Sequence, residues 1–358
     1  MTRRGGGGGS IEILPFEDLD SRRELWERLA ASSRNVFASW EWAQVWWRHF
    51  GAGNEPAFAE CRREDGTPFA ILPLHVARRG PLRLLRLLGH GPGDVLGPVC
   101  APVDAPLAGL ALREAASRLP GRRRVLLAER LPGGPLAASF GGHLLLREAN
   151  PSLATGGRSW DEFLSGRSRN LREKVRRGGR KLERSHEVAY RLCTDPERVE
   201  AEMTTLLRLH RERWGEGTGF GRPEVVAFHR DLAAALLGRD RLRLWTMELD
   251  GEAVAAWYGF RFEGIESFYQ SGRDPSHDKL SVGFQMLAKT LEAAFEDGLE
   301  RYDFLRGNEP YKDRFADSDG GLETRVVGQG PLGRTLVAGG ALGLRSPHLR
   351  RLLRGRFE

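Results

Sequence analysis

Asp303 is a carboxylate inside a short apolar segment, 301–305, that is predicted to form a β-strand. A carboxylate removed from water is costly unless a cation or a hydrogen-bond donor meets it. Lys312, Arg306 and Arg273 are the candidates for that partner, and we expect Asp303 and Lys312 to approach each other because only a short loop separates them. Such a pair is a candidate for catalysis, and it is equally a candidate for a structural ion pair that anchors a loop.

A second candidate site lies at the start of a helix predicted over 281–297, which follows a strand predicted over 265–272. Ser281 is expected to cap the helix, Gly283 lets a ligand approach the backbone closely, and Lys279 adds a positive charge. Free amide donors, the positive end of the helix dipole and a cation together suit a pyrophosphate. An ordinary capped helix packed on a sheet would carry the same signals, so both interpretations stay open at this point.

The elements that must position these residues follow an order that occurs twice in the chain. In each half two predicted helices precede a β-hairpin, which turns at Glu64-Asp65-Gly66 in the first half and at Asp250-Gly251 in the second. The Asp-Gly pair is a strong short-range hairpin signal. The helices are expected over 21–31 and 39–50 in the first half, and over 196–214 and 223–237 in the second. Strands over 82–88 and 124–128 then flank a helix over 105–119, as strands 265–272 and 301–305 flank the helix over 281–297.

This repetition predicts an α/β protein of two tandem domains, each with a mixed central sheet flanked by helices. We expect the domains over 11–150 and 158–330, with a polar Gly- and Pro-bearing join at 150–157 and a last strand over 323–327 in the second domain. Residues 1–10, which include five glycines, are expected to be a disordered tail, and the basic residues 331–358 a second tail.

Further motifs follow one another along the second half of the chain. They are Arg169-Asn170-Leu171-Arg172 in a basic helix, the strand Tyr269-Gln270-Ser271-Gly272, the helix start Ser281-Val282-Gly283, Gly298 before Tyr302-Asp303-Phe304-Leu305-Arg306-Gly307, and Tyr311-Lys312 before Arg314-Phe315. Together they resemble the acyltransferase domain of the GNAT superfamily. Within it they are most similar to the branch that contains the cellulose-biosynthesis CelD-type proteins, and more remotely to the Fem-type peptidyltransferases. The resemblance covers about half of the chain, and the first half shares only the order of elements.

The resemblance implies tandem GNAT-like domains and a reaction in which an acyl group moves from acyl-CoA, such as acetyl-CoA, to an amine. The acceptor would be an amine of a sugar, an amino acid or a cell-envelope or polysaccharide precursor. The pantetheine arm would lie between the strands over 265–272 and 301–305, with the pyrophosphate on Lys279 to Gly283. Members of the superfamily carry more glycine in that loop than this chain does. An aminoacyl-tRNA donor, as in the Fem-type enzymes, and a non-catalytic protein that binds RNA or an anionic polymer are therefore the alternatives.

Acyl transfer to an ammonium acceptor needs a base and a donor to the tetrahedral oxyanion. The catalytic candidates are Asp303, Glu309, Tyr311 and Lys312. The candidates for donor binding are Lys279, Leu280, Ser281, Val282, Gly283, Gln270 and Ser271. The candidates for acceptor binding are Tyr269, Asp94, Arg306 and Trp257, of which Asp94 belongs to a Gly-rich loop at 89–98 in a first domain that is expected to be catalytically degenerate. No metal is expected, because the histidines are scattered and show no ligand spacing, and His229 and His277 are assigned to packing or the surface.

The net charge of +7 has one local source. Between Ser165 and His186 there are nine basic and two acidic residues, which equals the whole formal excess. The predicted helix over 167–184 has a narrow apolar stripe at Leu171, Val175 and Leu182, with Gly178 and Gly179 weakening its middle. Three interpretations remain open: a solvated face, a phosphate-attracting wall beside the donor site, or a surface for tRNA, lipid or acidic polysaccharide.

Composition excludes several other classes of protein. The hydrophobic fraction of 40% and the nine tryptophans allow buried cores, which excludes wholesale disorder. The three cysteines lie far apart and predict neither a disulfide framework nor a cysteine-rich zinc site. No run is long and apolar enough for a transmembrane helix, and residues 1–10 do not resemble a signal peptide. We therefore expect a cytoplasmic protein whose contact with a membrane or an anionic polymer is at most weak, and its oligomeric state stays open.

Overall fold

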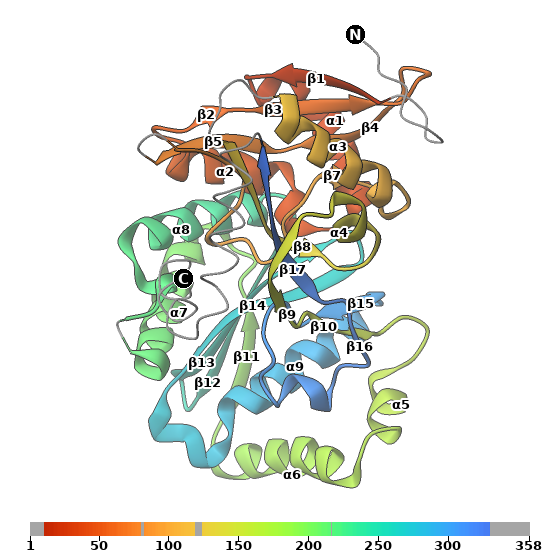
Figure 1. Ribbon diagram of the computed structural model, residues 1–358. Coiled ribbons are helices and arrows are strands. Elements are labelled where there is room, and N and C mark those ends of the chain that lie inside the picture. The colour runs from red at the N-terminus through yellow and green to blue at the C-terminus, as the bar shows by residue number, and fades with distance from the viewer. Residues whose placement is uncertain (1–10, 80–81, 119–123, 216, 330–358) are drawn as a thin grey trace. The chain divides into compact units, whose positions relative to one another are not determined.

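The computed structural model describes residues 11–79, 82–118, 124–215 and 217–329, and it divides the chain into two compact units (Figure 1). The first unit comprises Met1–Ala149 and Gly320–Glu358, and the second is Asn150–Asp319. The tails predicted over 1–10 and 331–358 lie outside the described residues. All three cysteines, Cys61, Cys100 and Cys193, are free and buried.

The first unit contains two sheets that share a continuous stretch of chain. One has the strand order β1-β3-β4-β7 and the other the order β2-β5-β6-β8-β17-β9. Only Pro73 separates β4 from β5 along the chain, so the chain passes directly from one sheet to the other. The strands are β1 (Glu12–Phe16), β2 (Glu55–Pro56), β3 (Phe58–Arg62), β4 (Pro68–Leu72), β5 (Leu74–Arg79), β6 (Leu82–Leu87), β7 (Val99–Cys100), β8 (Arg124–Pro132), β9 (His143–Glu148) and β17 (Leu322–Gln329).

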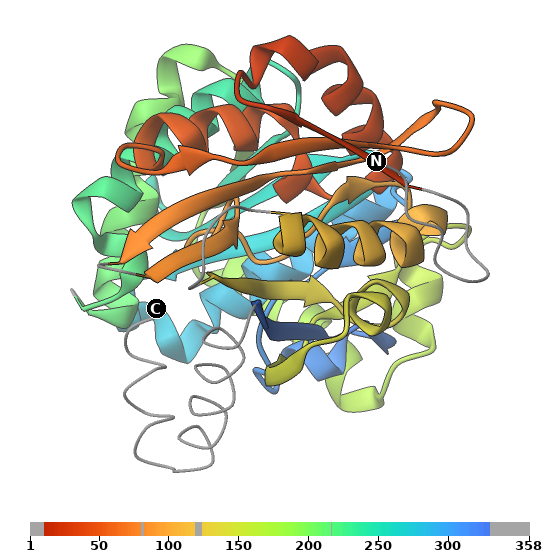
Figure 2. The ribbon, with the colours of Figure 1, turned by 45° about the horizontal axis from the view of Figure 1, so that its top comes forward.

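The helices of the first unit cover its strands on both faces. They are α1 (Arg23–Ser33), α2 (Trp40–Phe50), α3 (Ala105–Arg118) and α4 (Pro135–Phe140). Phe58 of β3 packs against Trp26 and Trp47 of α1 and α2, whereas its neighbour Ala59 belongs to the core under α3, as the alternation of side chains along a strand requires. Figure 2 shows α3, in gold, on the side of the strands away from the red helices α1 and α2. Ser39 caps α2 by accepting a hydrogen bond from the Trp42 amide, as predicted.

The second unit contains one sheet of seven strands in the order β11-β12-β13-β14-β15-β10-β16. The strands are β10 (Pro151–Ala154), β11 (Val188–Leu192), β12 (Leu242–Leu249), β13 (Glu252–Phe262), β14 (Ile265–Arg273), β15 (Arg301–Asp303) and β16 (Ser318–Asp319). The hairpin of β12 and β13 turns at the predicted Asp-Gly pair. Strands β14 and β15 run parallel, connected by α9, and the other neighbours are antiparallel.

Helices cover the two faces of this sheet in two groups. They are α5 (Trp160–Ser165), α6 (Arg169–Ser185), α7 (Val199–Trp214), α8 (Pro223–Leu237) and α9 (Val282–Glu296). The core that contains Trp257 and Phe268 includes residues of α5, α6 and α9, whereas Tyr258 meets His229 of α8. Successive residues of β13 therefore face the two groups. No helix within the described part of the chain is long and apolar enough to cross a membrane.

Short 3-10 segments lead into or connect several of these elements in both units. They are Asp20–Arg22, Val36–Ala38, Pro102–Asp104, Pro196–Arg198, Gly219–Gly221, Pro275–Leu280 and Lys312–Arg314.

The two units repeat one order of elements, which confirms the predicted tandem architecture. In the first unit β1 is followed by α1, α2, β3, β4 with β5, and β6, and α3 then leads into β8, which pairs in parallel with β6. In the second unit β11 is followed by α7, α8, β12, β13 and β14, and α9 leads into β15, which pairs in parallel with β14. A right-handed crossover through a helix is the ordinary way to join such parallel strands.

Two strands, β10 and β17, correct the domain boundaries expected from the sequence. The polar segment 150–157 is not a free linker, because it contains β10, which pairs with both β15 and β16 in the second unit. The strand predicted over 323–327 is β17, and it pairs with β8 and β9 of the first unit, not within a domain over 158–330. A strand pattern specifies which face is buried, but it does not specify the partner.

Candidate active site

The parallel pair β14 and β15 separates after three residue pairs. Ile265 is opposite Arg301 and Ser267 is opposite Asp303, where β15 ends, whereas β14 continues to Arg273. A β-bulge follows at once on β14, because the register with β13 shifts between Phe268, which is opposite Gly259, and Gln270, which is opposite Tyr258. Bulges bend a strand and interrupt pairing, and they are frequent beside active sites. A cavity of about 360 Å³ lies at this divergence.

The walls of the cavity combine apolar and charged side chains from several elements. Helix α9 and strands β13 and β14 supply most of the apolar wall, and α6 and α7 each supply one cation. The apolar residues are Ala255, Ala256, Trp257, Phe268, Phe284, Met286 and Leu287, the charged residues are Lys174, Arg213, Arg273 and Asp278, and Ser271, Gly272, Ser281, Gly283 and Tyr311 complete the lining.

Arg213, near the end of α7, extends into the cavity and donates from Nη1 to the hydroxyl of Ser271 at 2.8 Å. Burial lowers the pKa of its guanidinium, and the positive charge of Arg273 lowers it further. Arg273 itself is paired with Asp278, with 2.6 Å between Nε and Oδ1. Since Asp278 is the only carboxylate among the described lining residues, cations outnumber anions and the cavity favours an anionic ligand.

Lys174 brings a further cation from the basic helix α6. Its Nζ lies 4.2 Å from the centre of the Phe284 ring, at the first turn of α9. Burial lowers the pKa of this ammonium, and the charge of Arg314 lowers it in addition. Gly178 leaves room for the amide of Gln285 on α9: a Cβ there would lie 2.0 Å from Nε2 of Gln285, which donates to the Lys174 carbonyl of α6 at 3.0 Å. Gly178, which lowers the helix propensity of α6, therefore permits the packing of α6 against Gln285 of α9.

The start of α9 leaves backbone donors free at the cavity. Ser281 occupies the N-cap position, but its backbone is left-handed, with φ 56 and ψ 37, and its side chain makes no capping hydrogen bond. The predicted serine cap is therefore wrong. A capping side chain normally needs an extended backbone, which Ser281 cannot adopt while its amide ends the preceding 3-10 segment on the Asp278 carbonyl.

The amides of Val282 and Gly283, in the first turn of α9, consequently have no acceptor in the described part of the chain. A Cβ added to Gly283 would meet only the flexible Cδ of Arg273, at 3.1 Å, within 4 Å. The amide donor of the small residue Gly283 and the positive end of the helix therefore lie beside the cations of the cavity, which is an arrangement that binds phosphate groups.

Tyr311 lies on the cavity wall close to Phe268, with 6.4 Å between the ring centres. Burial raises the pKa of its phenol well above its usual value, and the carboxylate of Glu309 raises it further while Arg213 lowers it. The hydroxyl is therefore protonated at neutral pH and can donate a proton or a hydrogen bond.

The predicted approach of Asp303 to Lys312 is replaced by contacts with other groups. Oδ1 of Asp303 is 2.7 Å from Nε of Arg301, two residues earlier on the same face of β15. Nζ of Lys312 is 2.9 Å from Oε2 of Glu309 and donates to the Arg306 carbonyl at 2.8 Å. Lys312 is buried, and it holds the loop that follows β15.

Five of the predicted site residues come together in the cavity: Trp257, Ser271, Ser281, Gly283 and Tyr311. The others lie outside its described lining, and these are Asp303, Glu309, Lys312, Lys279, Leu280, Val282, Gln270, Tyr269, Arg306 and Asp94. Val282 is buried in the core and Lys279 is exposed. The Tyr269 ring packs against Phe260 on the face of the sheet that meets α8. Asp94 belongs to the first unit, and its proposed contact with the acceptor stays a prediction.

Sequence reasoning missed Lys174, Arg213 and Asp278 as lining residues, and it considered Arg273 only as an ion-pair partner. A signal for Arg213 was present, since it follows His210, a buried residue of α7, by three positions and shares its helix face. Gly272 is the reason that this face meets β14, because a Cβ there would lie 2.3 Å from the His210 amide nitrogen.

The corresponding place in the first unit is filled by its own chain. Strand β8 continues beyond Leu127, the last residue paired with β6. There the amide of Leu96 donates to the Arg130 carbonyl at 3.0 Å. Nη1 of Arg130 donates to the carbonyls of Gly91 and Gly93. The loop 89–98 thus packs against the divergence of β6 and β8, and the catalytic degeneracy expected of the first domain stays a prediction.

No group of three or more potential metal ligands from His, Cys, Asp and Glu occurs among the residues that the structure describes.

Comparisons with known proteins agree with this geometry. Residues 169–313 match the family model described as an acetyltransferase (GNAT) domain, which is less than half of the chain. The solved structure of FemX is similar over 87% of this chain and 95% of its own, with a TM-score of 0.60 and 12% identity. The C-terminal domain of a lysylphosphatidylglycerol synthetase from Agrobacterium fabrum is similar over 91% and 96%, with a TM-score of 0.55 and 12% identity. L-PGS from Bacillus licheniformis is similar over 88% and 93%, with a TM-score of 0.53 and 13% identity.

No curated protein matches the chain in sequence. At these identities the solved structures show the fold alone. The fold is a tandem GNAT-like α/β fold, and the GNAT match coincides with the unit that holds the cavity. The match is to an acyltransferase domain, whereas the cellulose-biosynthesis branch expected from the motifs stays a prediction.

Proposed function

We propose that the second unit transfers an acyl group from an acyl-coenzyme A donor, such as acetyl-CoA, to an amine. The observation that carries this proposal is the cavity at the divergence of β14 and β15, where free amides at the start of α9, three cations and an apolar wall meet. A CoA ester has the same division into a polyanionic end and a less polar arm that ends in a thioester.

The residues present fit such a donor. The amide of Gly283 would hold the pyrophosphate, with Arg213 and Lys174 as counter-charges. The less polar arm would lie along the edge of β14 beyond Ser267, where β15 no longer pairs with it. A strand edge offers unpaired backbone groups to an amide-containing arm.

The chemistry needs few side chains. The acceptor nitrogen attacks the thioester carbonyl carbon, the tetrahedral intermediate collapses, and the C–S bond breaks. The departing thiolate needs a proton from a protonated group on the cavity wall. In this proposal Tyr311 supplies it from its phenol. Glu309, whose charge acts on the pKa of Tyr311, is the predicted base that remains beside the site, and we assign to it the proton lost by the amine.

A calorimetric titration with CoA and acetyl-CoA tests the donor, with Gly283→Val as the variant and Gly283→Ala as its matched control. The branched valine would displace Arg273 and cover the amides, so we expect binding to be lost, whereas alanine should weaken it only slightly. Native protein that binds neither ligand would refute the donor class and leave an aminoacyl-tRNA donor or a non-catalytic role as the alternatives.

The acceptor is a separate question. The resemblance seen in the sequence supports an amine of a sugar or of a cell-envelope precursor, so a panel of such amines is the place to begin. Release of free thiol from acetyl-CoA in the presence of one amine, and not without it, would identify the acceptor class.

A further inference from the structure

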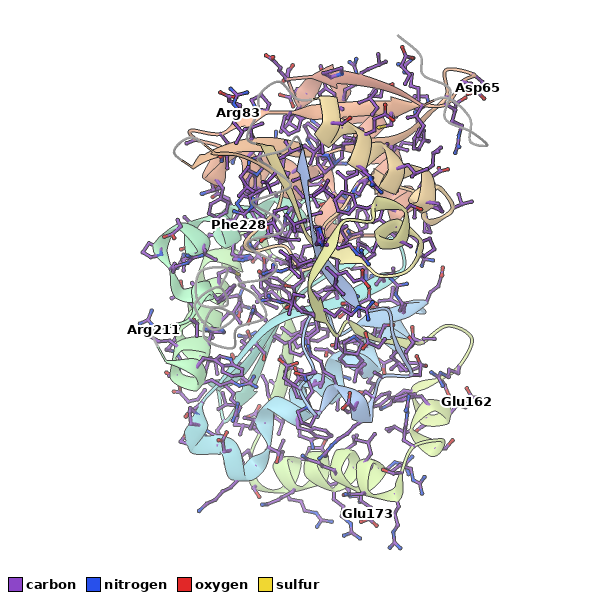
Figure 3. The ribbon with its side chains drawn as sticks, in the orientation of Figure 1. Asp65, Arg83, Glu162, Glu173, Arg211 and Phe228 are labelled. Carbon is purple, nitrogen blue, oxygen red and sulfur yellow. The ribbon has the colours of Figure 1, made fainter. Side chains whose placement is uncertain are left out.

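Helix α6 presents a row of cations to solvent. Its exposed basic side chains, which we name the α6 basic face, are Arg169, Arg176, Arg177, Arg180, Lys181 and Arg184. The apolar residues Leu171, Val175 and Leu182 pack into the core on the opposite side of the helix. Figure 3 shows the labelled Glu173 at the outer edge of this helix.

Neighbouring carboxylates compensate only part of this charge. In the first half of the helix Arg169 and Arg177 share Glu173, at 2.9 and 3.6 Å, and Arg176 is 3.4 Å from Asp161. These pairs are exposed and therefore weak.

In the second half, Arg180, Lys181 and Arg184 form no ion pair within the described part of the chain. The excess of positive charge is thus concentrated along one side of a single rigid element. It lies on a helix whose position is fixed by core packing, and it therefore presents a fixed charge pattern to a partner.

We propose that the α6 basic face docks the protein on an anionic phospholipid membrane. A row of cations on one side of a helix complements a planar array of phosphates, and basic clusters of this size bind anionic lipid surfaces. Because the apolar stripe of α6 is already used in the core, the contact is electrostatic and reversible, without insertion of the helix into the bilayer.

The geometry favours a plane over a nucleic acid. Helix α6 lies along α9 and is flanked by α5 and by the 3-10 segment Pro275–Leu280, so it does not project as a helix must to enter a groove about 12 Å wide. No aromatic side chain lies on the α6 basic face, whereas surfaces for single strands combine cations with aromatic side chains that stack on bases.

Docking through α6 has a consequence for the site. Lys174 belongs to the same helix and lines the cavity, so the cavity would come close to the plane of the lipid phosphates. The cavity could then receive a substrate that is held at the membrane. This consequence rests on the proposed function, whereas the docking itself does not.

Co-sedimentation with vesicles tests the proposal. The full chain is mixed with vesicles of phosphatidylcholine alone and of phosphatidylcholine with phosphatidylglycerol, at low and at high salt. We expect binding only to the anionic vesicles and its loss at high salt, because screening shortens the range of the attraction. The variant Arg177→Gln/Arg180→Gln/Arg184→Gln should weaken partitioning by about two orders of magnitude, since each basic residue near the surface contributes about a factor of five.

Two controls separate this face from net charge. The variant Arg28→Gln/Arg113→Gln/Arg211→Gln removes equal charge from exposed positions on α1, α3 and α7 and should bind anionic vesicles almost as the native chain does. Lysine in place of Arg177, Arg180 and Arg184 should retain binding, because charge and not the guanidinium shape is required.

Three outcomes would overturn the proposal. In the first, the native chain binds vesicles with and without phosphatidylglycerol equally. In the second, the two glutamine variants lose vesicle binding to the same extent. In the third, the native chain binds a short duplex RNA more tightly than the vesicles at the same salt. The last outcome would assign the face to nucleic acid. CoA titration and melting of each variant report separately on the cavity and on folding, so failure of docking and failure of the proposed function are distinguishable.

Discussion

Replacing Arg213 by methionine should separate recognition of the donor from the stability of the fold. Methionine keeps an unbranched apolar stem while it removes the guanidinium. The hydroxyl of Ser271, which loses its donor at 2.8 Å, borders the cavity and can bind water instead. We therefore expect the free energy of unfolding to change by about 1 kcal/mol or less.

The affinity for CoA should fall much more. A hydrogen bond to a charged group is worth about 1.5 to 3 kcal/mol, which corresponds to a loss of roughly 10- to 150-fold in Kd. Burial already lowers the pKa of Arg213, so an anion beside it would relieve an unfavourable environment, and this places the effect toward the upper part of the range.

The measurement is a calorimetric titration of CoA into native protein, Arg213→Met and Arg211→Met. Arg211 lies two residues earlier on the same helix, is exposed, and is labelled at the outer side of α7 in Figure 3. It therefore controls for any change in helix charge or propensity. Equal affinities of the two variants would refute the assignment of Arg213 to the donor, and parallel losses in melting temperature would show instead that Arg213 is structural.

Three further variants test other parts of the structure. Tyr311→Phe should lower kcat for thiol release by about 10²- to 10⁴-fold while leaving the Kd for CoA unchanged, and normal turnover would exclude Tyr311 as the proton donor. Gly178→Ala should destabilise the fold by about 1 to 3 kcal/mol in urea unfolding, because its Cβ, 2.0 Å from Nε2 of Gln285, would displace that buried amide from its hydrogen bond to the Lys174 carbonyl. Gly179→Ala, whose nearest neighbour is at 3.8 Å, should stabilise the fold slightly. Burial raises the pKa of Glu266 from 4.5 to about 7, so the folded state binds the proton more tightly than the unfolded state and stability should fall as pH rises across that window. Glu266→Gln should remove this part of the pH dependence. The free energy of unfolding is measured with urea at several pH values between pH 5 and pH 8. If it changes with pH equally in the native chain and in Glu266→Gln, the assignment is contradicted.

The elements and their repetition were predictable because local signals agree with the fold. The Asp-Gly turn fixes the hairpin of β12 and β13, in which Leu249 is opposite Glu252. The helix after β14 was predicted for the same kind of reason, and its first-turn glycine, Gly283, lines the cavity, while its contact with a pyrophosphate stays a prediction. Such signals act over a few residues, so a single sequence is enough to find them.

The ion pairs and the sheet partners of β10 and β17 were not predictable in the same way. Asp303 was expected to need a partner, and it has one, but Arg301 on its own strand was closer than the distant lysine. Arg213 reaches the cavity only because Gly272 admits a whole helix against β14. Contacts of this kind depend on how closely two elements pack. The residue pattern within one element does not specify that distance.

The position of β17 also affects the order in which the chain can fold. The second unit, Asn150–Asp319, is one uninterrupted stretch, whereas the strand between β8 and β9 of the first unit is supplied by residues that follow it. The second unit is thus an insertion within the first. During synthesis the unit with the candidate active site has all its strands before the earlier unit receives its last one. Until then the edges of β8 and β9 that pair with β17 stay unpaired. Separate chains of residues 11–150 and 158–330 would leave the first sheet without β17 and the second sheet without β10.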